Sequence, residues 1–366
     1  MTKKNIEISL LQDTDIDDVI RFYNSIYKSN RTRDKFDWEF KDAAAGKAIY
    51  VIAKDSDTKI IVGTQCAIPI ELIATRGKSI LTAKSEDTLV DPAYRGLNIF
   101  ENMYKLLFEE CRKSGIKYLW GFTSAKKPFL KLGFEIHYDH SQSLMVFDVL
   151  SSYRYLSGLN ANNTSGSKIK IFLLCALAKG VALKNYFYFG NDLIRDFEIS
   201  VKTKAQAIDN SELQKSLVNN QFAIKQDAAY LNWRVKNNPY HEKIVSVTFS
   251  SKAQEVANII FNEHKPGIWY LLNDVYTQEL SQQQKVAMLH RSIKLLQHQE
   301  HRKVELIRAM DFNHNDYAIQ EMEHRKKTGF VHLDRGISFV WISLDEQNTL
   351  NAKDFILSRI ATQGIV

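Results

Sequence analysis

One turn in the sequence limits the possible folds more than any other feature. Three alternating apolar segments, at 48–55, 59–75 and 79–90, are separated by short turn sequences, which predicts an antiparallel meander. The third segment runs directly into Pro92-Ala93-Tyr94-Arg95-Gly96 and then into a helix. The apolar face of that helix consists of Ile99, Met103, Leu106 or Leu107, and Cys111. We therefore expect a sheet whose third meander strand feeds a helix through a turn that contains both proline and glycine.

The flanking segments extend this pattern to a mixed α+β domain over residues 1–150. A strand is expected at 6–11, followed by an amphipathic helix. After the central helix we expect a strand at 117–123, a short helix at 127–134 that ends at Gly133, and a last strand at 140–150. The predicted sheet is mainly antiparallel with helices on its flanks.

The same order of elements returns in the second half of the chain. Trp38 in FDWEF is matched by Trp233 in AYLNWRV, 195 positions later, and the sequence KLGF at 131–134 is matched by KTGF at 327–330, 196 positions later. Agreement of the two offsets and of the element order indicates two copies of one fold. We divide the chain into a first domain at 1–150, a helical linker at 151–220 and a second copy at 221–366.

Composition and charge indicate a globular protein that is not a dedicated nucleic-acid binder. Hydrophobic residues make up 45% of the chain, enough for sizeable cores, and the lysines behind the net charge of +7 are dispersed. Such a diffuse positive field is typical of a solubilising surface, and it also favours phosphate-bearing ligands or an anionic membrane face.

Other features place the protein in the cytoplasm. The start MTKKNIEISLLQDTD has no apolar stretch of signal-peptide length, and the three cysteines, Cys66, Cys111 and Cys175, have no zinc spacing and are expected to be reduced. The apolar run 169–183 is too short to span a membrane. It predicts a buried helix, or alternatively a helix that lies on a membrane surface.

The turn at 92–96 has the chemistry of a phosphate site. A helix N-terminus presents unpaired N–H groups and a partial positive charge, Gly96 permits close backbone approach, and Arg95 adds a cation rich in donors. From the residues alone, an ordinary turn with a surface arginine is an equally good interpretation.

A resemblance to a known family adds to this interpretation. The run VDPAYRGLNIF resembles motif A of the GNAT superfamily of acyl-CoA-dependent N-acyltransferases, and FTSAKKPFLKLGFE resembles motif B. The resemblance implies acetyl-CoA or another acyl-CoA as co-substrate, without a metal. Its pyrophosphate would bind the amides of Arg95, Gly96, Leu97, Asn98, Ile99 and Phe100, its pantetheine arm would lie along Leu89 and Val90, and Ser124 and Phe129 of motif B would complete the site.

The sequence departs from the family pattern at three positions. Asn98 stands where the family usually has glycine, and Phe100 where it has glycine or alanine. Asparagine tolerates a left-handed backbone, whereas the Phe100 ring has to point into the core. Phe129 occupies the position of a tyrosine that often protonates the leaving thiolate, so another group or water must supply that proton if the domain is catalytic.

A base is needed to neutralise the amine that attacks the thioester. Glu86 and Asp87 precede motif A, and strand alternation sends them to opposite faces. We favour Asp87, because Glu86 shares its face with Lys84 and is free to pair with it. The pairs His137 with His140 and His298 with His301 are weaker candidates, expected in loops and on a solvated helix face.

Three functions are compatible with these observations. The favoured one is an N-acyltransferase that acts on a small amine such as an amino sugar, an amino acid or a polyamine. The alternatives are an aminoacyl transferase of the Fem type, which takes its acyl group from charged tRNA, and a non-catalytic module that binds acyl-CoA. The second copy has no Arg-Gly turn before its helix at 281 and should not hold a pyrophosphate. The acceptor, the acyl length and the oligomeric state are not specified by the sequence.

Overall fold

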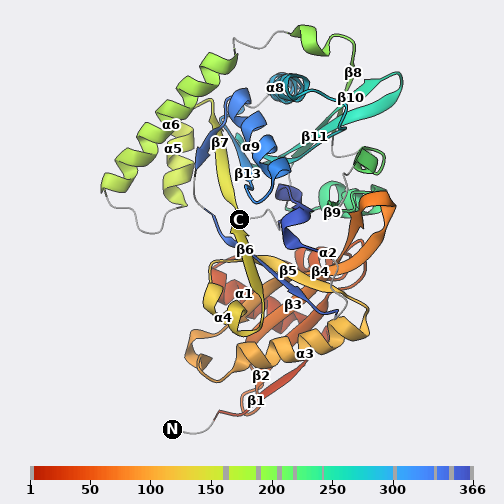
Figure 1. Cartoon of the computed structure of the whole chain (residues 1–366). Helices are drawn as coiled ribbons and strands as arrows, with labels where there is room; N and C mark the ends of the chain where they lie inside the picture. Colours follow the sequence, from red (N-terminus) through yellow and green to blue (C-terminus); the bar gives the residue numbers. More distant parts are fainter. Residues whose placement is uncertain are drawn as a thin grey trace.

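Two mixed β-sheets with flanking helices make up the protein, as a computed structural model shows (Figure 1). The structure describes residues 4–159, 165–186, 191–203, 208–216, 221–240, 243–299, 303–333, 336–345 and 350–362. The mainly antiparallel, duplicated α+β architecture predicted from the sequence is confirmed.

The first sheet contains the predicted meander. Its strand order is β1-β2-β3-β4-β5-β15-β6, and β9 and β16 join at the side through β3. The strands are β1 (Ile6–Leu10), β2 (Ile49–Asp55), β3 (Ile61–Ala74), β4 (Ser79–Val90), β5 (Tyr118–Thr123), β6 (Glu135–Asp139), β9 (Phe222–Ile224), β15 (Ser338–Ser343) and β16 (Phe355–Ile356). The helices of this half are α1 (Ile16–Tyr27), α2 (Arg33–Phe40), α3 (Ile99–Lys113) and α4 (Lys126–Lys131). The predicted apolar face of α3 is buried at Ile99, Met103, Leu107 and Cys111.

The second sheet repeats the arrangement. Its order is β14-β7-β13-β12-β11-β10-β8. The strands are β7 (Ser141–Val146), β8 (Glu198–Thr203), β10 (Lys243–Ser251), β11 (Gln254–Lys265), β12 (Ile268–Tyr276), β13 (Leu306–Asp311) and β14 (Val331–Leu333). Its helices are α7 (Ala228–Leu231), continued by η6 (Asn232–Lys236), α8 (Gln282–Gln299) and α9 (Asp316–Thr328).

The halves exchange strands. β7, from the first half of the chain, pairs with β13 in the second sheet, whereas β15, from the second half, pairs with β5 and β6 in the first sheet. The predicted strand at 140–150 is also shorter than expected, because the Asp148 side chain accepts from the amide of Ser151 and starts helix α5 (Val149–Gly158). Domain boundaries at 150 and 221 stay a prediction, and each sheet includes a strand from the other side of them.

The two tryptophans that revealed the duplication meet at the junction of the halves. The Trp38 indole donates to the carbonyl of Trp233 and the Trp233 indole donates to the carbonyl of Trp38, each over 2.8 Å. Both residues lie on short helices after the first strand of their copies. The second repeated sequence, KLGF and KTGF, also has the same structure in both copies. Its glycines, Gly133 and Gly329, follow α4 and α9 in left-handed conformations with φ of 89° and 113°.

The predicted linker is structured along most of its length. It carries α5, the long helix α6 (Ser165–Tyr186) and the edge strand β8. α6 lies on the outside of the second half (Figure 1), and no helix in the described ranges is both long and apolar enough to cross a membrane. Part of the polar segment 160–168 lies outside the described residues.

One topological feature positions the candidate site. β4 and β5 run parallel and pair only at Ala83 with Leu119 and at Lys84 with Trp120, after which they part. Strand β4 therefore leaves its edge unpaired on that side from Ser85 onward, directly before the turn that leads into α3.

Candidate acyl-CoA site

A cleft of about 850 Å³ opens where β4 and β5 separate. Its walls come from the end of β4, the turn before α3, the first turn of α3, the end of β5 and helix α4. Most residues predicted to contact the co-substrate line it: Val90, Arg95, Gly96, Asn98, Ile99, Phe100, Ser124 and Phe129. Leu89 and Leu97 do not line it, because Leu89 is buried in the core and Leu97 points outward, 42% exposed. Both candidate bases, Glu86 and Asp87, line the cleft.

The turn leaves a row of main-chain donors unused. Asp91 closes its first part by accepting from the amide of Ala93 at 2.8 Å, and its carbonyl accepts from the amide of Tyr94. Among the described residues, the amides from Gly96 to Glu101 have no hydrogen-bond partner. Helix α3 also has no side-chain cap at Asn98. Free N–H groups at the N-terminus of a helix of 15 residues form a site for a phosphate group.

The two unusual residues of the turn are accommodated. Gly96 and Asn98 both have positive φ, 84° and 55°, so asparagine takes the left-handed conformation expected of it. The Phe100 ring turns toward the core, with its centroid 4.8 Å from that of Tyr104 and 5.6 Å from that of Phe129. It forms part of the cleft wall.

A β-bulge changes the expected geometry of Glu86 and Asp87. Cys66 pairs with Glu86 and Thr64 with Leu89, so β4 has one residue more than β3 between these pairs. Asp87 carries the bulge, with φ of 55°. Alternation, which would place the two carboxylates on opposite faces, is interrupted here, and both residues line the cleft.

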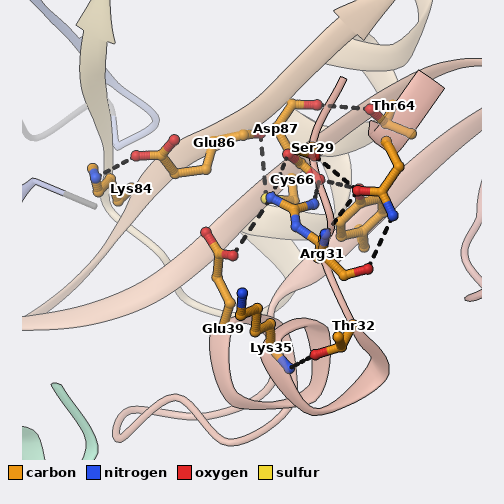
Figure 2. Close-up of polar contacts among 12 residues, drawn as sticks. Ser29, Arg31, Thr32, Lys35, Glu39, Thr64, Cys66, Lys84, Glu86 and Asp87 are labelled. Atoms are coloured by element: carbon orange, nitrogen blue, oxygen red, sulfur yellow. Dashed lines mark hydrogen bonds and ion pairs between the residues drawn. The ribbon is translucent and has the colours of Figure 1, made fainter. Parts of the chain in front are cut away.

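Asp87 is held by a buried ion pair (Figure 2). Arg31 donates to its two carboxylate oxygens over 2.7 and 3.1 Å, and the Tyr50 hydroxyl donates to the same carboxylate over 2.5 Å. The Thr64 hydroxyl donates to the Asp87 carbonyl over 2.8 Å. Both charged side chains of the pair are only 4% exposed. These contacts fix the bulge in its left-handed conformation.

Arg31 also joins a second carboxylate to this cluster. Its guanidinium lies 3.5 Å from Glu39 and 3.3 Å from the centroid of the Tyr23 ring. Burial raises the pKa of Glu39 to about 7 against the opposing effect of Arg31. Arg31 was not identified from the sequence, where it stands in a polar segment that resembles any solvated connection between helices.

Glu86 is in a different environment. Its carboxylate pairs with the Lys84 ammonium, as expected, and its side chain is 27% exposed (Figure 2). Burial lowers the pKa of Lys84, because it penalises the charged ammonium. Glu86 thus keeps contact with the cleft, whereas the oxygens of Asp87 are occupied by Arg31 and Tyr50.

A closed ring of hydrogen bonds lies beneath the cleft. The Gln65 amide donates to the Ser85 hydroxyl over 3.0 Å, and the hydroxyls of Ser85 and Tyr104 are 2.7 Å apart. The hydroxyls of Tyr104 and Thr88 are 3.5 Å apart, and Thr88 donates back to the Gln65 side-chain oxygen. Ser85 and Thr88 line the cleft, so the ring connects the buried Tyr104 to it. Tyr104 packs beside Phe129, the residue that replaces the family's tyrosine.

The histidines do not contribute to this site. His137 contacts Glu135, and burial lowers its pKa; burial lowers the pKa of His140 to about 4. Neither lines the cleft. His298 is exposed at the end of α8, and His301 lies outside the described residues. The described part of the chain contains no group of side chains suited to a metal ion.

The second copy closes the corresponding helix N-terminus with its own side chains. The Ser281 hydroxyl accepts from the amide of Gln284 over 3.2 Å, and the Gln284 side chain accepts from the amide of Ser281 over 2.9 Å. This reciprocal capping box uses donors that remain free in α3. The prediction that this turn holds no pyrophosphate agrees with that geometry.

Comparison with known proteins gives one family and several solved structures of the same fold. Residues 7–137 match the family model described as an acetyltransferase (GNAT) domain. No curated protein matches the sequence.

Solved structures share the fold over almost the whole chain. A probable N-acyltransferase of Enterococcus faecalis V583, otherwise of unknown function, is 8% identical with a TM-score of 0.59, over 93% of this chain and 73% of that one. A tandem GNAT protein from the clavulanic acid biosynthesis pathway is 11% identical with a TM-score of 0.55, over 94% and 100%. N-myristoyltransferase of Saccharomyces cerevisiae, solved with bound myristoyl-CoA and inhibitors, is 13% identical with a TM-score of 0.57, over 100% and 88%.

Proposed function

We propose that this chain, whose residues 7–137 match an acetyltransferase (GNAT) domain, moves an acetyl or other acyl group from acyl-CoA to a small primary amine. The observation that carries this proposal is the row of free amides at 96–101, beside a cleft whose other wall is the unpaired edge of β4. The amides would hold the pyrophosphate, with Arg95 as an additional cation. The pantetheine arm would add to β4 as a short extra strand.

Glu86 is the better placed of the two predicted bases. In the reaction the amine nitrogen attacks the thioester carbonyl carbon, the carbon–sulfur bond breaks, and the amine loses a proton. Glu86 lines the cleft with a partly exposed carboxylate and would accept that proton, directly or through water. Asp87 would act as a positioning residue, because its contacts with Arg31 and Tyr50 fix the bulge next to the reacting carbonyl.

The thiolate that leaves must gain a proton, and Phe129 has none to give. The hydrogen-bonded ring supplies hydroxyl groups at the cleft wall, and we assign this step to Ser85 or Thr88, which Tyr104 holds in place. The hydroxyl would give its proton to the thiolate and regain, through water in the cleft, the proton that Glu86 takes from the amine. Tyr104 is fully buried and burial raises its pKa, so it stays protonated. It would therefore act through its neighbours without touching the substrate.

Replacing Tyr104 by phenylalanine tests this step. We expect kcat to fall about 100-fold while KM for acetyl-CoA stays the same, because the hydroxyl supports proton transfer and does not line the cleft. Steady-state kinetics in both substrates measure the two constants. Tyr138→Phe is the matched control, since the buried Tyr138 hydroxyl has no partner among the described residues. Equal kcat values for the two variants would exclude this role of the Tyr104 hydroxyl.

The proposed function is tested by thiol release from acetyl-CoA in the presence of amino sugars, amino acids and polyamines, combined with thermal-shift titration. Stabilisation by CoA together with turnover supports the transferase. Stabilisation without turnover for any amine would favour a binding module. Indifference to CoA together with binding of charged tRNA would favour the Fem-type alternative.

Helix α6 supports a membrane-surface contact. Its outer face exposes Ile169, Phe172, Leu173, Leu177 and Leu183, each between 41% and 62%. The helix contains lysines and no acidic residue, so its charge complements an anionic lipid surface. The opposite face packs on β7 through Ile171, Cys175 and Ala178. We propose that α6 lies on anionic membranes, which is compatible with a cytoplasmic protein.

Vesicle co-sedimentation tests the α6 proposal. Vesicles that contain phosphatidylglycerol should bind the protein, and pure phosphatidylcholine should bind much less. The double change Leu173→Glu with Leu177→Glu should reduce the bound fraction at least ~10-fold. The reason is that two leucines that become buried in the lipid contribute several kcal/mol to membrane binding. Unchanged vesicle binding by the double variant would contradict the proposal. The proposal would also be contradicted if the unmodified protein formed a dimer in solution and the double variant were a monomer, because α6 would then be a subunit interface.

A further inference from the structure

The second copy has a cleft of its own at the place that corresponds to the acyl-CoA cleft. β12 and β13 run parallel and pair from Ile268 with Leu306 to Tyr270 with Arg308, and then separate as β4 and β5 do. A cleft of about 460 Å³ lies beyond that point. It is lined by the end of β12, by α8, by α9 and by segments near Gln214, Gln226 and Ser358. Its chemistry differs from that of the first cleft, because the amides of Ser281 and Gln284 at the start of α8 are already bonded within the protein.

Arg325 lines this cleft, and its guanidinium is already paired with carboxylates of the protein. Its guanidinium contacts Asp274 at 2.6 Å, Asp311 at 3.0 Å and the Met310 carbonyl at 3.0 Å. Asp311 in turn contacts His332 at 3.0 Å. Arg325 therefore links β12 to β13 through these ion pairs, and its charge is not available to an anionic ligand.

Several acceptor atoms in the cleft remain unpaired. Within the described residues, one carboxylate oxygen of Asp274, one of Glu321 and the Tyr276 hydroxyl are buried and have no hydrogen-bond partner. The side chains of Asp274 and Glu321 are 2% and 7% exposed, and all three residues line the cleft. A buried carboxylate oxygen without a donor is costly, so these atoms are the ones that a ligand would satisfy.

The charges around the cleft favour a cation. Three carboxylates line the cleft, those of Asp274, Asp316 and Glu321, against two permanent cations, Arg325 and Lys285. Lys285 makes no ion pair with the described residues, and its ammonium lies 5.6 Å from the centroid of the Tyr276 ring. The Tyr276 ring therefore already faces one cation, and its buried hydroxyl is the group that remains for a ligand. The other oxygen of Glu321 faces His324 at 3.3 Å, so the unpaired oxygen is the one available to a ligand.

We propose that the second cleft is a binding site for a small organic cation that carries a primary ammonium or a guanidinium group. The N–H groups of the ligand would donate to the unpaired oxygens of Asp274 and Glu321 and to the Tyr276 hydroxyl. This proposal goes beyond acyl transfer and does not depend on it. It gives the degenerate copy a ligand of its own in place of the pyrophosphate that its capped helix cannot hold.

Calorimetric titration with agmatine, which carries both cationic groups, tests the proposal on the intact chain. Binding should persist with putrescine, vanish with glutarate, and remain unaffected by saturating acetyl-CoA. Glu321→Gln keeps the shape of the side chain and should weaken agmatine binding at least ~10-fold, as should Asp274→Asn, because a charge-assisted hydrogen bond is lost.

Glu323→Gln is the matched control, since Glu323 lies on the same helix, pairs with Lys326 and does not line the cleft. Thermal unfolding of each variant checks that it is folded. The proposal is overturned if neither amine binds the unmodified chain, if Glu321→Gln and Glu323→Gln bind agmatine equally, or if acetyl-CoA displaces the amine.

Discussion

Replacing Arg95 by glutamate should weaken acetyl-CoA binding about 10- to 100-fold. The exposed Arg95 lines the cleft beside the free amides, so the change removes a charge-assisted donor and places a carboxylate near a diphosphate. The fold should be unaffected, because no hydrogen bond from the Arg95 side chain holds the described structure together. Isothermal titration calorimetry with acetyl-CoA measures the change directly.

Lys105→Glu provides the control for overall charge. Lys105 is exposed on the same helix, away from the cleft, and the substitution alters the net charge of the protein by the same amount. Diffuse electrostatic attraction would weaken binding equally in both variants. A loss confined to Arg95→Glu would locate the pyrophosphate at the turn, and equal losses would remove the turn from the site.

Arg31→Met should destabilise the protein by about 3–5 kcal/mol, because it leaves the buried carboxylate of Asp87 without its partner. Urea unfolding measures this change. The double variant Arg31→Met with Asp87→Asn should recover much of the lost stability, since the amide carries no charge to compensate. Its acyl transfer should remain impaired if the ion pair positions the bulge.

Arg33→Met is the control for the loss of an arginine from this segment. Arg33 is 42% exposed and pairs with Asp37 and Asp17, so its removal should cost less than about 1 kcal/mol. Similar losses in Arg31→Met and Arg33→Met would show that the buried pair contributes little. Full activity in the double variant would show that the bulge does not need Arg31.

The sequence predicted those structural features that depend on residues close together in the chain. The period of apolar residues indicated the meander and α3, and the turn residues indicated where the chain changes direction. Gly96 and Asn98 have the left-handed backbones that their side chains permit. The position of the cleft followed from the same stretch, because a helix that follows a strand through such a turn brings its N-terminus to the end of the sheet.

Features that arise from contacts between distant segments were not predictable in this way. Nothing in the sequence of β4 marks an extra residue, so the bulge at Asp87 appears only against its partner β3. Strands β7 and β15 look like any others, and packing alone decides that each joins the sheet of the other half. Tyr104 adjoins the apolar face of α3 and reads as a core residue, and nothing local indicates its bond to Ser85.

The most direct test of the central claim compares acetyl-CoA with S-acetylpantetheine, which has the same thioester and pantetheine arm but no diphosphate. Calorimetric titration of the unmodified protein should give measurable binding of acetyl-CoA and at least ~100-fold weaker binding of S-acetylpantetheine, because only the former can use the amides of Gly96 to Glu101. Equal affinities for the two compounds would contradict the assignment of those amides to the pyrophosphate.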